Sequence, residues 1–446
     1  MGHFSTFECF RPHFNALARV GYFKIVMRDI PRHKYMLHSA YRAVAFCLVL
    51  LYNLQHVVKV YKSRHSTDMI INVLFVLLTT LNTLSKQLAF NLRSRRIDRL
   101  IRVIDGPLFA YSKPNHDQSM SQNATEMSSL LTLYHGAIFT CGTLWAVFPL
   151  VNRALGVDVA FTAYFPFDTS MTPRFELAIA YLTVLITFQA YGHVTMDCTI
   201  VSFYAQGKTQ LQIFRYNLEH LVDAHDESVK IDGNLNCNNN DLVGYKDMGY
   251  EARERLKKRF VRCLLHFRQI VWFINEVELI FFEAMVLQFL VSAWVICMTL
   301  YKIVSLSILS AEFVSMAVYL GCILAQLLSY CYYGTQLKVE SEMVNQSIYC
   351  CDWLQLSPGF RRLLLVLMER CRRAIVPRIA FVIPLSLETY IAVSKADHNL
   401  INVDMGCHSV WLHLYLSKLI TVVVQLPSLF SGIYWSQSLE EPRKWK

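Results

Sequence analysis

Long apolar stretches, separated by charged and polar segments, dominate the pattern of this chain. Six of them cover residues 41–61, 69–92, 130–151, 174–205, 278–301 and 307–336, and a shorter, less apolar seventh covers residues 377–393. At about 1.5 Å per residue, roughly 20 helical residues cross the hydrocarbon core of a bilayer. The pattern therefore predicts an all-α polytopic membrane protein with seven transmembrane helices.

A helical pattern also continues outside the apolar stretches. Residues 251–275 carry apolar side chains at every third or fourth position, namely Leu256, Phe260, Leu264, Phe267 and Val271. This period is typical of an amphipathic helix. We expect that helix to join the fifth span as one rod, whereas the polar stretch at residues 235–241 in front of it predicts a flexible loop.

The charges support a membrane protein and predict its orientation. Charged residues make up 17% of the chain, against about 25% in an average soluble protein. Lys and Arg number 31 in segments 1–42, 93–129, 206–277 and 336–378, but 6 in the segments that alternate with them. Since positive residues gather on the cytoplasmic side, we expect a cytoplasmic N-terminus, long cytoplasmic helical extensions and an outward end of the seventh span. This orientation is opposite to that of a G-protein-coupled receptor.

The net charge of +10 could suggest nucleic-acid binding, but the basic residues flank the apolar stretches, so no nucleic-acid partner is expected. The sequence also lacks the motifs of a serine hydrolase, a nucleotide-binding loop or a zinc site. We therefore expect no enzymatic activity, no cofactor and no metal site.

Short motifs in a fixed order follow the sixth stretch. They are Tyr332-Tyr333-Gly334, Glu340-Ser341-Glu342, Ser347-Ile348-Tyr349, Asp352-Trp353, Arg361-Arg362, Met368-Glu369-Arg370 and Leu385-Ser386-Leu387-Glu388-Thr389. Each motif alone is weak, but the ordered set resembles the C-terminal signature of insect odorant receptors. The resemblance covers roughly residues 1–393 and does not include the tail.

The resemblance implies a subunit of an odorant-gated, non-selective cation channel. It implies a tuning subunit, which assembles with an olfactory co-receptor into a heterotetramer and binds a volatile small molecule. The expected location is the plasma membrane of olfactory sensory neuron dendrites, in contact with lipid. Three other classes are weighed against it: a gustatory receptor of the same architecture, a metabotropic seven-helix receptor and a secondary transporter.

The expected organisation has seven parts. They are a cytoplasmic N-terminal segment that lies on the membrane surface (1–40), helices 1–4 with the ligand pocket (41–205), a cytoplasmic loop with helices (206–277), helices 5–6 (278–336), a cytoplasmic anchor (337–376), a pore-lining seventh helix (377–393) and an atypical C-terminal tail (394–446).

Aromatic residues are concentrated in the predicted outer halves of the spans. An apolar volatile ligand needs a large desolvated surface with a few hydroxyl groups. Ordinary helix packing or an interfacial aromatic belt would explain the same residues. Because the resembled family holds odorants between these spans, the expected odorant-binding residues are Phe75, Trp145, Phe148, Tyr181, Phe188, Phe313 and Tyr319.

The seventh stretch carries polar residues that would be unfavourable in lipid. Ser386, Glu388 and Thr389 are therefore expected to line a water-filled pore, the alternative being a packed helix in which Glu388 pairs with Arg378. The resembled family holds its subunits together through the anchor. The residues expected to make these contacts are Trp353, Arg361, Arg362, Leu364 and Leu367.

Three further charged or titratable residues lie within spans. His193 and Asp197, four residues apart, could form a proton or metal pair, but a simple hydrogen-bonded pair is favoured. Lys86 lies near the inner end of the second span and is expected to extend towards the membrane surface.

The tail departs from the family pattern. Polar residues follow Val393, and a second apolar run covers residues 410–434. We hypothesise that residues 394–446 derive from a retained intron or an alternative exon, which would give a product that binds ligand but conducts poorly.

Overall fold

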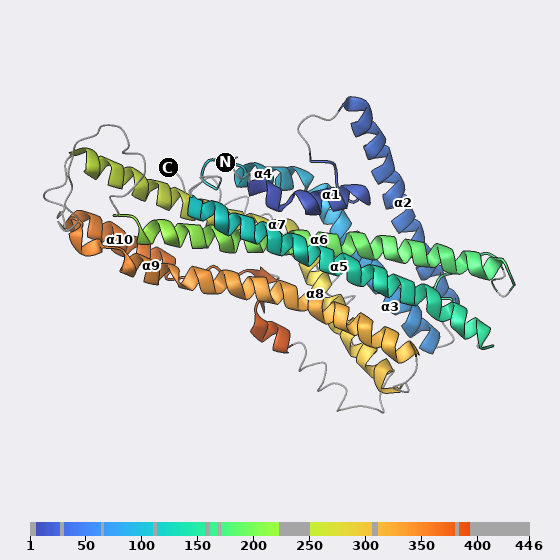
Figure 1. The fold of residues 1–446 in the computed structure, drawn as a ribbon. Helices are drawn as coiled ribbons and strands as arrows, with labels where there is room; N and C mark the ends of the chain where they lie inside the picture. Colours follow the sequence, from blue (N-terminus) through green and yellow to red (C-terminus); the bar gives the residue numbers. More distant parts are fainter. Residues whose placement is uncertain are drawn as a thin grey trace.

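The computed structural model describes residues 6–26, 31–63, 67–109, 114–156, 161–167, 169, 171–222, 250–305, 311–379 and 383–392. These residues form a bundle of long helices (Figure 1). In order, the elements are η1 (Thr6–Cys9), α1 (Arg11–Arg19), α2 (Arg32–Lys62), α3 (Thr67–Leu92), α4 (Ser94–Ile104), α5 (Pro114–Ala154), α6 (Arg174–Glu219), α7 (Tyr250–Ser305), α8 (Ala311–Glu342), α9 (Val344–Cys350), η2 (Trp353–Gln355), α10 (Pro358–Cys371), β1 (Arg378–Ile379) and β2 (Ile383–Pro384).

Six of these helices are long and apolar enough to cross a membrane: α2, α3, α5, α6, α7 and α8. The first five predicted spans each fall within one of them. The sixth does so from Ala311 onward, because residues 306–310 lie outside the described part. The chain is therefore a mostly helical, polytopic membrane protein. The hydropathy pattern predicted the positions of these spans because a helix that crosses a bilayer must be both long and apolar.

Several helices extend well beyond a bilayer. As predicted, residues 251–275 and the fifth span form one helix, α7, of 56 residues. Helix α5 begins at Pro114, well before the predicted start of its span, and α4 occupies a segment for which no helix was predicted. Ile97, Leu100 and Ile104 form the buried stripe of α4. Their spacing of three and four was a visible helix signal.

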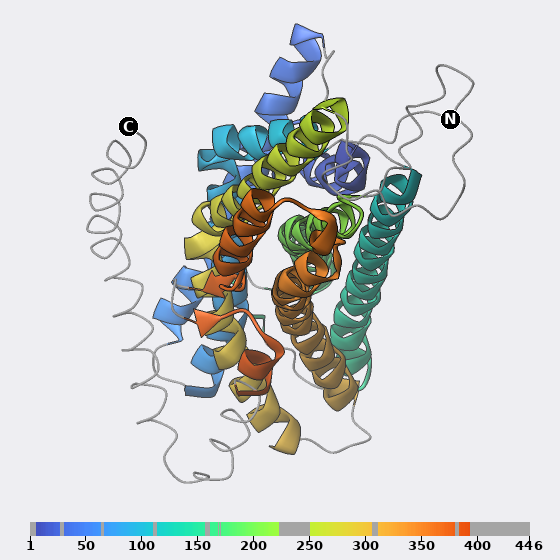
Figure 2. The same ribbon diagram turned by 90° about the vertical axis from the view of Figure 1, so that its left-hand side faces the viewer.

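Helix α6 lies at the centre of the bundle and packs against α5, α7 and α8 (Figure 2). The N-terminal segment packs against it as well, through Phe10 and Phe203, whose ring centroids are 5.0 Å apart. Tyr22 lies so close to Gly192 of α6 that a Cβ there would be 2.3 Å from its ring. We expected this segment to lie on the membrane surface. Its apolar face is instead buried within the protein.

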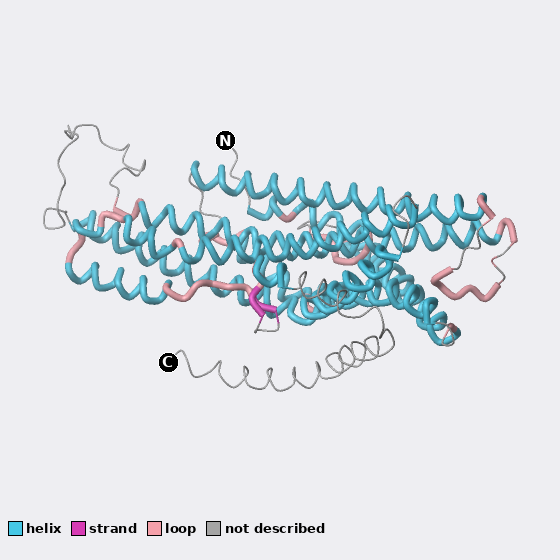
Figure 3. The backbone as a smooth tube through the Cα atoms, turned by 90° about the horizontal axis from the view of Figure 1, so that it is seen from below, coloured by secondary structure: helices cyan, strands magenta, loops and turns pink. Residues whose placement is uncertain are grey.

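The predicted helix over residues 377–393 is wrong in its first half. Strands β1 and β2 form a short antiparallel hairpin that pairs Arg378 with Pro384 and Ile379 with Ile383 (Figure 3). Helical structure starts at Leu387 and is described to Ala392. Pro384 explains the difference, because its ring lacks an amide N–H and clashes with the preceding helical turn. The tail at residues 394–446, with its second apolar run, lies outside the described residues.

Candidate ligand-binding site

A cavity of about 200 Å³ lies between α3, α5, α6, α7 and α8. Apolar and aromatic side chains line one end, including Phe75, Trp145, Val295 and Tyr319. The rings of Phe75 and Tyr319 lie 5.0 Å apart, and the side chain of Thr79 also lines the cavity. This end offers desolvated surface with one hydroxyl-bearing ring, which suits a small organic molecule.

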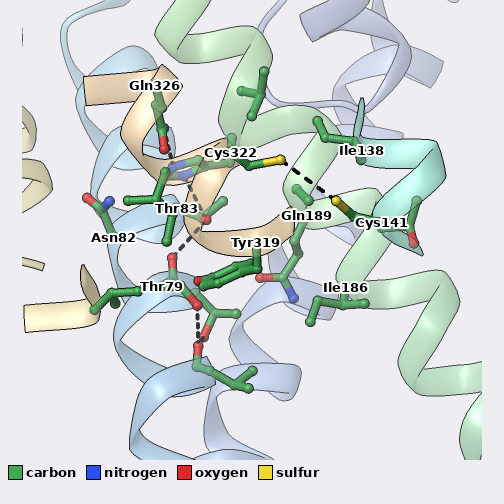
Figure 4. Close-up of a pocket in the computed structure, with 18 of the residues that line it drawn as sticks. Thr79, Asn82, Thr83, Ile138, Cys141, Ile186, Gln189, Tyr319, Cys322 and Gln326 are labelled. Carbon is green, nitrogen blue, oxygen red and sulfur yellow. Dashed lines mark hydrogen bonds between the residues drawn. The ribbon is translucent and has the colours of Figure 1, made fainter. Parts of the chain in front are cut away.

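Polar side chains form the other end of the cavity, which we call the polar floor. Its members are Asn82, Thr83, His193, Gln288 and Gln326. Figure 4 shows Gln326 and Thr83 on one side of Tyr319, with Cys322 beside them. The cavity is thus amphipathic from end to end, a property that the aromatic pattern of the sequence did not reveal.

A buried ion pair supports the polar floor. The Lys86 ammonium contacts the Asp197 carboxylate, and their side chains are 0% and 5% exposed. Lys86 also donates to Gln288 Oε1 at 2.6 Å. Asp197 accepts from the Tyr330 hydroxyl at 2.6 Å and from the amide of Gln326. The expectation that Lys86 extends to the membrane surface is therefore wrong, because its counterion lies on the neighbouring helix α6.

The hydrogen bonds of His193 assign its tautomer. Its Nε2 lies 3.2 Å from the Lys86 ammonium and 3.0 Å from the Gln326 amide, both of which are donors. The Nε2 atom must therefore accept, so the proton is on Nδ1 and points to Thr83 Oγ1 at 3.0 Å. The sequence favoured a direct hydrogen bond between His193 and Asp197. Their atoms Nε2 and Oδ2 lie 3.4 Å apart, but both are acceptors, so no hydrogen bond forms between them. Lys86 and Gln326 bridge them instead.

Two cysteines face each other in the wall of the cavity. Cys141 Sγ of α5 lies 3.8 Å from Cys322 Sγ of α8, and both thiols are free (Figure 4). Both residues lie in apolar stretches of the sequence, far apart along the chain. Only the packing of α5 on α8 brings them together.

The structure brings together three of the seven predicted odorant-binding residues: Phe75, Trp145 and Tyr319 line the cavity. Tyr181 instead donates to Gln55 Oε1 at 3.0 Å, and Phe188 packs edge-on against Tyr22 at 5.8 Å.

Phe148 and Phe313 also lie outside the lining. Tyr181 and Phe188 are seven residues apart and share one face of α6, but this spacing does not show which neighbouring helix that face contacts. On α6 the cavity-facing residues are instead Ile186, Thr187, Gln189, Ala190, His193 and Val194.

The predicted pore residues differ in their surroundings. Ser386 is 6% exposed, and its hydroxyl accepts from the backbone N–H of Thr389 at 3.3 Å. The Thr389 hydroxyl donates to the Pro384 carbonyl at 2.7 Å. These bonds cap the start of a helix, and the burial of Ser386 within the subunit argues against a pore-lining position for its side chain. Glu388 is exposed.

The predicted anchor contacts need a similar correction. Leu364 and Leu367 are 4% and 3% exposed, because this face of α10 packs inside the subunit. Arg361 donates to the Leu356 carbonyl at 2.8 Å and lies 6.0 Å from the Trp353 ring. Arg362 is exposed. The sequence identified the amphipathic helix correctly but assigned its buried face to the partner subunit.

The seventh segment is attached to α8. The backbone N–H of Leu387 donates to Thr335 Oγ1 at 3.0 Å. A Cβ at Gly334 would lie 2.3 Å from the Leu385 carbonyl oxygen, so only glycine permits this approach. Helix α8 therefore contacts the cavity through Tyr319, Cys322 and Gln326, and it contacts the seventh segment about two turns later, at Gly334 and Thr335.

The chain is similar to a family of known proteins. The family model described as "7tm Odorant receptor" matches residues 66–396. Odorant receptor 23a of Drosophila melanogaster is 22% identical over 344 residues, which cover 73% of this chain and 80% of that protein. Odorant receptor Or1 of Anopheles gambiae is 20% identical over 359 residues, covering 78% of this chain and 84% of the relative.

Solved structures share the fold. The olfactory receptor OR5 of the insect Machilis hrabei matches with a TM-score of 0.73 at 15% identity, covering 89% of this chain and 97% of that one. Its complex with eugenol matches with a TM-score of 0.71 at 14% identity, covering 88% and 97%.

Proposed function

Since the chain belongs to the odorant receptor family, we propose that it is the odorant-binding, tuning subunit of a ligand-gated, non-selective cation channel. It works with an olfactory co-receptor in a heterotetramer, in the plasma membrane of olfactory sensory neuron dendrites. The observation that carries this proposal is the cavity between five helices, with aromatic walls and a polar floor. The similar receptor solved with eugenol supports a small aromatic volatile as the ligand.

Helix α8 supplies a path from ligand to pore. It lines the cavity with Tyr319, Cys322 and Gln326 and then holds the seventh segment at Gly334 and Thr335. A ligand that fits better when α8 occupies its open-state position stabilises that state by the difference in affinity. Ligand contacts thereby shift the position of the helix that starts at Leu387.

That helix is our proposed pore helix. Glu388 in its first turn is exposed, whereas a carboxylate facing lipid would be unfavourable by several kcal/mol. An exposed acidic side chain at the same position in each subunit would attract cations to a shared conduit. Ser386 is buried, whereas the half-buried Thr389 stays a candidate for the water-facing surface of this helix; both side chains also form hydrogen bonds at its start.

The anchor is proposed to hold the subunits together through the outer face of α10. Leu363, Leu365 and Val366 are 51%, 63% and 67% exposed on a helix that lies beyond the apolar spans. Buried apolar side chains at the centre of an interface supply most of its binding energy. The bias of Lys and Arg supports a cytoplasmic location for this end of the molecule and for the N-terminus.

The proposal is tested by expressing the chain with the co-receptor and recording excised-patch currents while volatiles are applied. We expect a cation current within milliseconds that does not depend on GTP. A current that needs GTP would support a metabotropic receptor, and responses to involatile tastants alone would support a gustatory receptor. A parallel version with residues 394–446 replaced by a family-like C-terminus tests whether the tail weakens conduction.

A further inference from the structure

The cavity contains buried polar groups with no partner among the described residues. Gln189 of α6 is 2% exposed and lines the cavity, yet neither its amide oxygen nor its amide nitrogen has a hydrogen-bond partner there. Figure 4 shows its amide beside the ring of Tyr319, within the cavity. A buried amide left unpaired is unfavourable by about 1–3 kcal/mol, so this side chain has the character of a ligand-binding group.

A second unpaired acceptor follows from the ion pair. Lys86 is a donor only, so the Gln288 atom that it meets at 2.6 Å must be the amide oxygen. Asn82 meets the same oxygen at 2.5 Å and must therefore present its NH₂ group. This arrangement leaves Asn82 Oδ1 without a partner among the described residues, while Asn82 also lines the cavity.

Two carbonyl oxygens of the cavity wall thus lack a donor, one on α3 and one on α6. An ester, ketone or ether can accept from the Gln189 NH₂ group but has no proton to donate to either oxygen. A hydroxyl group can both donate and accept. A charged carboxylate is disfavoured because Asp197 already neutralises Lys86, the cation that contacts His193 and Gln288 of the polar floor.

We propose that this cavity recognises hydroxyl-bearing odorants, that is, alcohols or phenols, through Gln189. The hydroxyl donates to Gln189 Oε1, while the apolar body of the ligand packs against Phe75, Trp145 and Tyr319. The amide nitrogen of Gln189 then adds a second, donating contact. This inference rests on the proposed function and names the chemical class of ligand.

Binding to the purified full chain tests the inference without requiring conduction. Two series of probes are titrated by thermal shift: 2-phenylethanol, its methyl ether and ethylbenzene, and 1-hexanol, its methyl ether and hexane. In at least one series we expect the alcohol to bind about 10-fold more tightly than its ether, because the ether has no proton to donate to the unpaired amide oxygens of Gln189 and Asn82. In Gln189→Met this ratio should fall to less than threefold.

Gln206→Met is the matched control, because Gln206 is also a buried glutamine of α6 but lies outside the cavity lining. It should keep the 10-fold preference. An alcohol-to-ether ratio near one in the natural sequence, a ratio unchanged in Gln189→Met, or no binding of any probe would each overturn the inference. Odorant-evoked currents with other volatiles would then still support the proposed function, whereas their absence, also in the version with a family-like C-terminus, would contradict it separately.

Discussion

The ammonium group of Lys86 and the carboxylate of Asp197 form a buried ion pair between α3 and α6, although the two residues are 111 positions apart in the chain. A buried pair of this kind becomes strongly destabilising when one partner is removed, because the other charge stays buried without compensation. The pair joins the two walls of the cavity and orients the side chains of its polar floor.

Replacing one partner of this pair should therefore destabilise the protein. We expect Lys86→Met or Asp197→Asn to lower the stability by about 3–5 kcal/mol, seen as a lower melting temperature and reduced surface expression. The double variant Lys86→Met/Asp197→Leu should recover part of the loss. Lys24→Met, at the partly exposed pair with Asp98, serves as the control with an effect below about 1 kcal/mol. Equal effects of the two lysine substitutions would contradict the role of the buried pair.

The close approach of α8 to the seventh segment predicts a functional effect at Gly334. In Gly334→Ala the new Cβ would meet the Leu385 carbonyl oxygen at 2.3 Å and must displace the segment. We expect odorant-evoked current to fall at least 10-fold while ligand binding changes little. Gly321→Ala on the same helix is the control, since nothing described lies within 4 Å of its Cβ position. Normal currents from Gly334→Ala would rule out this coupling.

The facing thiols predict an oxidative cross-link. Cys141 and Cys322 are 3.8 Å apart, so a small movement brings their sulfurs to bonding distance. Mild oxidation with copper phenanthroline should form a disulfide between α5 and α8, detected by mass spectrometry of the digest, and should weaken odorant binding by tightening the cavity wall. Reduction should restore binding, and Cys141→Ala should be insensitive. A digest without this linkage would argue against the packing of the two helices.

Burial of His13 predicts a pH dependence in the N-terminal segment. Burial lowers the pKa of His13 from 6.5 to about 4. The neutral ring is therefore favoured in the folded state, so stability is unaffected above pH 6.5 and declines as the pH falls towards 4. At pH 5 the loss is about 2 kcal/mol.

We expect His13→Phe to reduce the fall in melting temperature between pH 7.5 and pH 5. His33→Phe, in which the replaced ring is exposed, is the control and should leave that fall unchanged. An identical pH response in the natural chain and in His13→Phe would show that His13 is not the titrating group.

The two faces of α10 should respond differently to substitution. Val366→Glu changes the exposed face and should lower the fraction of tetramers in native electrophoresis while the subunit still folds. Leu367→Ala changes the buried face and should lower the melting temperature of the subunit itself by removing packed apolar groups. Loss of folding from Val366→Glu would mean that this face packs within the subunit.

The sequence by itself determined the membrane class, six spans, the continuous rod of α7 and the family. These features depend on local properties: apolar length, helical period and an ordered set of motifs that can be read without knowing any neighbour. The absence of helix at residues 378–384 could also have been predicted, because Pro384 is a local helix-breaking signal. The prediction followed the apolar pattern of this stretch instead.

Only the tertiary structure decided which side chains meet. Lys86 was assigned to the membrane surface, and Phe188 to the ligand, because the rotation of each helix about its axis is not encoded in its own stretch. That rotation is set by packing against distant helices, which together determine the partner of each side chain. The same packing placed Gln189 in the cavity, Leu364 inside the subunit and Asp197 beside its cation.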